Sequence, residues 1–130
     1  MSIAMHVQAF ENKTFSTFKR SIAWNIFEPK AIPSVGAWDL IYDGRRGGTL
    51  MLDEDEFITG CSVRRPSESA VRDLYAVARQ VPSVLNLGED FFFADAKFLA
   101  GFPDFLLNDL PKPPQLVLSA DELLEQLLSW

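Results

Sequence analysis

The chain has 130 residues, 48% of them hydrophobic, and its 12 basic and 18 acidic side chains give a net charge of −6. A chain of this length and apolar content is expected to fold as one globular domain, residues 1–130, with a core that needs no metal. An anionic surface repels phosphate groups, so the charge argues against nucleic acid and anionic membranes as partners and favours a basic protein.

Cysteine usage and hydropathy indicate a compartment. The single cysteine rules out an internal disulfide and fits a reducing environment. The first ten residues lack the basic start and the long apolar core of a signal peptide, and no run approaches the ~20 apolar residues of a membrane-spanning helix. We therefore expect a cytoplasmic protein.

The N-terminal quarter predicts a strand, a helix and a linker. Alternation of apolar and polar residues over 3–10 is typical of a short strand. From residue 14 the apolar residues recur at helical spacing, which predicts a helix over 14–27 that Pro29 stops. The prolines and the glycine of residues 29–36 then predict a linker into the strands that follow.

Residues 38–66 carry the pattern of three consecutive antiparallel strands. Apolar residues alternate from Trp38 onward, so the face that carries Trp38 is expected to be buried. Asp43-Gly44 should open the first turn and Gly47-Gly48 should close it, because glycine supplies the positive φ angles of hairpin loops. The acidic run at 53–56 should form the second turn.

The second half of the chain alternates predicted helices and strands. These are a helix over 69–80 capped by Ser67 or Ser69, strands over 84–87 and 91–93 joined by a turn at Gly88-Glu89-Asp90, a short helix over 104–110 with Phe105, Leu106 and Leu110 facing inward, a strand over 115–118 and a helix over 119–129. Ser119 and Glu122 form a capping box for this last helix.

No motif in the sequence predicts catalysis, a cofactor or a metal. The acidic run resembles the start of a calcium loop, but Phe57 stands where a third oxygen ligand is needed. Cys61 and His6 have the types of a nucleophile and a base, yet no flanking charge activates the thiol, and Cys61 is expected to be a buried, inert side chain. The zinc-binding spacings are absent.

The sequence contains two pairs of adjacent arginines, a residue type that binds anions. Arg45-Arg46 lies in a glycine-rich stretch that lacks the lysine and the following helix of a P-loop, so a hairpin tip accounts for it. With Arg64-Arg65 it makes the only doubled arginines, too few to predict a nucleic-acid surface on an anionic chain.

From Trp38 onward the features follow one another in a fixed order: the strand and turn at 38–44, the acidic turn at 53–56, the strand at 58–66, the helix with Leu74-Tyr75, Pro113-Pro114 and the segment 116–119. This order resembles that of a group of small bacterial proteins. In size, acidity and lack of a catalytic constellation, the chain is also similar to the immunity proteins of bacterial polymorphic and contact-dependent toxin systems. The resemblance implies a protein that binds and blocks a cognate toxin, often a basic nuclease, and it transfers no catalytic residue.

The sequence therefore predicts an α+β domain: a mostly antiparallel sheet around the meander at 37–65, with helices at 14–27, 69–80 and 119–129 packed against it. The leading hypothesis is an immunity-type inhibitor, without catalysis or cofactor, that binds a basic toxin. Two alternatives stay open, a small acidic secretion chaperone and a small-molecule-binding protein or enzyme, and so does the oligomeric state, a homodimer included. The predicted partner-binding residues are Asp53, Glu54, Asp55, Glu56, Glu89 and Asp90.

Overall fold

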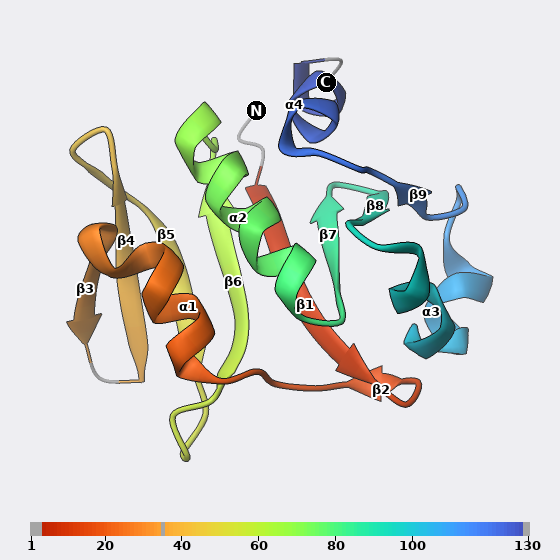
Figure 1. The fold of residues 1–130 in the computed structure, drawn as a ribbon, viewed down its shortest axis with the longest axis horizontal. Helices are drawn as coiled ribbons and strands as arrows, with labels where there is room; N and C mark the ends of the chain where they lie inside the picture. Colours follow the sequence, from red (N-terminus) through yellow and green to blue (C-terminus); the bar gives the residue numbers. More distant parts are fainter. Residues whose placement is uncertain (1–3, 35, 129–130) are drawn as a thin grey trace.

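The computed structural model describes residues 4–34 and 36–128, which form a mostly antiparallel sheet with helices packed on it (Figure 1). The strands are β1 (Ala4–Glu11), β2 (Thr14–Phe15), β3 (Ala31–Ser34), β4 (Ala37–Tyr42), β5 (Arg45–Leu52), β6 (Ile58–Arg64), β7 (Ser83–Leu87), β8 (Asp90–Phe93) and β9 (Gln115–Leu116). The helices are α1 (Arg20–Phe27), α2 (Glu68–Gln80), α3 (Asp104–Asp109) and α4 (Ala120–Leu128), with 3₁₀ helices η1 (Glu28–Lys30) and η2 (Ala96–Gly101). The predicted α+β class is confirmed.

The sheet has the order β3-β4-β5-β6-β1-β7-β8-β9, with β2 paired to β1. The predicted meander forms as β4, β5 and β6, but β1 lies between β6 and β7 and joins the meander to the second half of the sheet. Within the predicted linker at 29–36, residues 29–34 form the end of η1 and the edge strand β3, which the sequence did not predict. Pro33 suits an edge, since proline has no amide hydrogen for a further strand.

The hairpin between β4 and β5 turns over two residues. Asp43 and Gly44 have φ angles of +53° and +74°, the left-handed conformations that a tight two-residue hairpin turn requires. The prediction that Gly47 and Gly48 close this turn is wrong, because both lie within β5. Gly48 instead lets the neighbouring strands approach, since a Cβ there would lie 2.8 Å from the carbonyl oxygen of Ser62.

The sheet buries apolar side chains on both faces. On one face a large core joins the expected side chains of β4, such as Trp38, to α1, α2 and α4. On the other face a second core forms around Phe10 and Phe102, between β1, β7 and β8 and the segment made of η2 and α3. The strand β8 supplies both cores, because Phe92 belongs to the first and Phe93 to the second. This second face was not predicted.

The first helix is shorter than predicted. Thr14 and Phe15 pair with the end of β1 as β2, and α1 begins only at Arg20. The turn before β2 uses Asn12 and Lys13 at φ angles of +51° and +68°, which gives a hairpin without glycine. The predicted helix over 14–27 is therefore wrong for its first six residues.

The later helices begin where the capping residues predict. Ser67 caps α2 by accepting a hydrogen bond from the amide of Ala70 at 3.3 Å. At α4 the hydroxyl of Ser119 accepts from the amide of Glu122, whose carboxylate accepts in turn from the amide of Leu118. The helix is described to Leu128, and residue 129 of the predicted helix lies outside the described residues.

The segment at 104–110 is helical over Asp104–Asp109, as α3. Leu106 and Leu110 are partly buried against the second core as predicted. Phe105 is 57% exposed, so its predicted inward orientation is wrong. Its ring packs edge-on against Phe15 of β2 instead, with ring centroids 6.1 Å apart.

Candidate functional site

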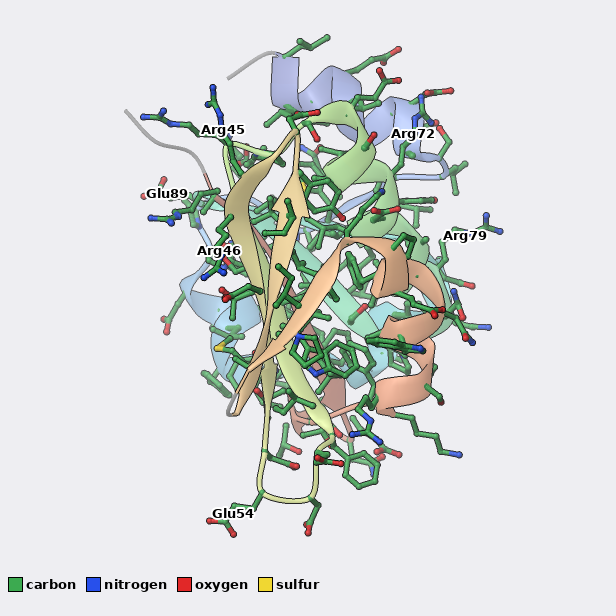
Figure 2. The ribbon with its side chains drawn as sticks, turned by 90° about the vertical axis from the view of Figure 1, so that its left-hand side faces the viewer. Arg45, Arg46, Glu54, Arg72, Arg79 and Glu89 are labelled. Atoms are coloured by element: carbon green, nitrogen blue, oxygen red, sulfur yellow. The ribbon has the colours of Figure 1, made fainter. Side chains whose placement is uncertain are left out.

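The predicted acidic turn connects β5 to β6 and is held by its own first carboxylate. Asp53 accepts hydrogen bonds from the amides of Asp55 and Phe57, both at 2.9 Å. Its carbonyl oxygen also accepts from the amide of Glu56, which has a φ angle of +64°. Asp53 therefore shapes the turn, whereas the side chains of Glu54 and Asp55 are exposed, and Glu54 points away from the sheet in Figure 2.

This turn forms one side of an open groove of about 990 Å³, here called the acidic groove. Trp24 of α1 and Trp38 of β4 line it and pack edge to face, with ring centroids 4.9 Å apart. Phe57, 41% exposed, adds a third aromatic ring beside the carboxylates. The groove thus combines negative charge with aromatic surface, the two features that attract a lysine or arginine side chain.

A cation of the chain itself already contacts the acidic groove. The guanidinium of Arg20, at the start of α1, donates a hydrogen bond to the carboxylate of Glu56 at 2.5 Å. Both side chains are about half exposed or more, so this ion pair is weak and open to exchange. The contact demonstrates that a guanidinium has room beside this turn.

The other predicted acidic residues lie elsewhere. Glu89 is exposed in the turn between β7 and β8, and Figure 2 places it far along the molecule from Glu54. Asp90 is not a turn residue as predicted but the first residue of β8, where its carboxylate pairs with Lys112 at 3.2 Å. The structure therefore brings Asp53, Glu54, Asp55 and Glu56 together and keeps Glu89 and Asp90 apart from them.

The candidate nucleophile and base do not meet. In the pairing of β1 with β6, His6 lies opposite Ser62, and Cys61 lies opposite Val7 in the large core. Side chains one residue apart on a strand point to opposite faces, so His6 and Cys61 cannot form a dyad. Burial raises the pKa of the Cys61 thiol to about 12, which keeps it protonated at neutral pH.

A partly buried polar cluster was not predicted from the sequence. The carboxylate of Asp73 on α2 accepts hydrogen bonds from the ammonium of Lys30 and the hydroxyl of Tyr42, both at 2.6 Å. The ammonium of Lys30 also lies 4.9 Å from the centre of the Tyr42 ring. The cluster ties η1 and β4 to α2, and residues 31 to 43 positions apart in sequence give no local signal of it.

The described residues hold no group of three or more His, Cys, Asp or Glu side chains placed to bind a metal ion. Within the same residues, no helix combines the length and the apolar character that crossing a bilayer demands. No family model, curated protein or solved structure matches this chain.

Proposed function

We propose that this chain is an immunity-type protein that binds a basic toxin through the acidic groove and neutralises it without catalysis. The observation that carries the proposal is the combination of Glu54 and Asp55, exposed at the edge of the groove, with the aromatic rings of Trp24 and Phe57 beside them. Charge speeds the encounter with a basic partner, and buried aromatic contacts slow its dissociation.

In the proposed complex a lysine or arginine of the toxin enters the acidic groove. Its aliphatic stem packs on the aromatic rings and its charged end pairs with the turn, displacing the contact between Arg20 and Glu56. A basic side chain that serves the toxin's activity would then be withdrawn from its substrate. Neutralisation follows from occupancy alone.

A secretion chaperone is the second candidate function. The C-terminal segment exposes large apolar side chains, with Leu118 and Leu128 at 68% and 85% exposure. An apolar surface of that kind would hold an unfolded effector segment. A chaperone would bind through these leucines and respond little to salt, whereas an inhibitor bound at the acidic groove would respond strongly.

The immunity proposal expects a toxin gene beside this one, so its test begins by expressing the product of each neighbouring reading frame. Co-expression with this chain should restore the growth of cells that make the product, and the purified pair should bind. In the variant that combines Glu54→Gln with Asp55→Asn, the association rate at low salt should fall about threefold or more, and the salt dependence should flatten. Asp53 is kept because it shapes the turn.

A matched control removes one aspartate and one glutamate charge elsewhere, with Asp109→Asn and Glu125→Gln, both exposed. This control should associate at the wild-type rate. Equal rates for the turn variant and the control would remove the acidic groove from the interface, and a slower rate for Glu89→Gln would move the interface to the turn between β7 and β8. Failure of the chain to restore growth would refute the immunity function itself.

A further inference from the structure

The fold brings the two arginine pairs of the sequence together. Arg45 and Arg46 begin β5, Arg64 ends β6 and Arg65 follows it, and the two strands are antiparallel neighbours. All four arginines line one pocket of about 570 Å³, here called the four-arginine pocket. It lies at the end of β5 away from the acidic turn, as the labels of Arg45 and Glu54 in Figure 2 show.

The positive charge of this pocket is largely uncompensated. The lining residues that the structure describes include four arginines and a single carboxylate, that of Asp43. Arg46 reaches Asp39 at 3.7 Å, a long and exposed contact. In the described parts of the chain Arg45, Arg64 and Arg65 have no ion pair, so the positive groups repel one another unless an anion lies between them.

The backbone at the pocket favours another residue than arginine. Arg65 has a φ angle of +47°, a conformation that glycine or asparagine adopts at lower cost. Residues in sparsely populated backbone conformations are more frequent at functional sites, which draws attention to this pocket. The strained backbone does not identify a ligand, but the residues that line the pocket indicate one.

We propose that the four-arginine pocket binds a phosphate-type oxyanion. Guanidinium groups are planar forks that bind such oxygens through two parallel hydrogen bonds. Ser67 also lines the pocket, and because its oxygen accepts from the amide of Ala70, its hydroxyl hydrogen is left to donate. As the cap of α2, Ser67 places the positive end of a 13-residue helix at the pocket.

The volume and the charge pattern favour a small anion over a nucleic acid strand. A pocket of about 570 Å³ has the size of a small-ligand site. The chain carries a net charge of −6, and the acidic turn at the far end of β5 would repel a long polyanion laid along the sheet. The ligand class is therefore an inorganic or nucleotide phosphate.

The test is calorimetric titration of the full chain with pyrophosphate at low ionic strength. Wild type should bind one equivalent saturably, and Arg45→Gln or Arg64→Gln should each weaken binding about tenfold, the loss expected for a charged hydrogen bond. Arg79→Gln removes the same charge from the far end of α2, on the other side of the view in Figure 2, and should bind as wild type does. Thermal unfolding of each variant checks that the fold is intact.

A parallel titration with ADP distinguishes the two sources of the anion. Tighter binding of ADP assigns a nucleotide, and equal or weaker binding assigns free phosphate. Absence of saturable binding, or equal affinities for the Arg64→Gln and Arg79→Gln proteins, would overturn the proposal. It would also fall if a single-stranded oligonucleotide or an acidic peptide bound more tightly than pyrophosphate. None of these results bears on the acidic groove, so the two proposals are tested separately.

Discussion

Replacing Gly48 by alanine should destabilise the fold much more than the same change at Gly47, one residue earlier in β5. A Cβ at position 48 would lie 2.8 Å from the carbonyl oxygen of Ser62, 2.9 Å from a methyl carbon of Val63 and 3.3 Å from the Cβ of Leu40. At position 47 the nearest atom is the carbonyl oxygen of Arg64 at 3.7 Å, an ordinary contact. The two positions therefore differ in the space that is available for a Cβ.

The expected cost follows from which atoms must move. The first contact is with backbone of β6, which cannot rotate away, and β6 also pairs with β1 in the middle of the sheet. Overpacking of this kind costs about 1–3 kcal/mol, and we expect Gly48→Ala to lie near the upper end. For a domain of this size that loss lowers the unfolding temperature by roughly 10 °C. Gly47→Ala should stay within about 0.5 kcal/mol of wild type.

Urea unfolding followed by tryptophan fluorescence measures both variants, since the chain has three tryptophans. Gly48→Ala should lower the midpoint without changing the slope, because the clash acts on the native state. Equal midpoints for the two alanine variants would refute the reasoning and show that β5 and β6 separate at little cost.

The remaining predictions concern buried ionisable groups. Because Cys61 is buried with a pKa of about 12, it should react with a thiol reagent only as the protein unfolds. The stability that comes from keeping this thiol neutral is fully present below pH 9 and is lost as the pH rises to 12, a loss of up to about 4 kcal/mol. Cys61→Ala should therefore flatten the dependence of stability on pH across that range. Burial, and then the hydrogen bond to Asp73, raises the pKa of Tyr42, so its contribution is lost as the pH rises above 10. Tyr42→Phe should cost about 1–2 kcal/mol at pH 7, as urea unfolding measures, and remove that part of the alkaline loss. An alkaline profile identical to wild type would contradict the assignment for either residue.

Local patterns predicted the elements of this fold better than their pairing. The alternation from Trp38 and the capping serines at 67 and 119 are local signals, and each was confirmed. The place of β1 between β6 and β7 depends on contacts across more than fifty residues, for which no local pattern exists. The run Phe91 to Phe93 carries a local signal of the second core, because three consecutive aromatic residues in a strand indicate burial on both faces.

The first helix was predicted too long because its apolar spacing continues through a segment that is not helical. Phe15 and Phe18 fall at helical spacing with Ile22, yet Phe15 lies in β2, and Phe18 forms an isolated bridge to Ile58 of β6. The turn residues are Asn12 and Lys13 instead of glycines, so the sequence carries no signal of the hairpin that competes with the helix. Pairing with the sheet outweighed helical periodicity in a segment of fewer than two turns.

The net charge of the chain does not show that its positive and negative side chains gather at separate sites. The net charge of −6 favours a basic partner, and each arginine pair alone is too small to predict an anion site. Antiparallel pairing of β5 with β6 places the pairs together at one end of β5, while the acidic turn lies at the other. Eight residues of strand span about 26 Å, more than twice the distance over which salt screens exposed charges. An anion in the four-arginine pocket and a cation in the acidic groove are thus expected to bind independently, although one strand carries both.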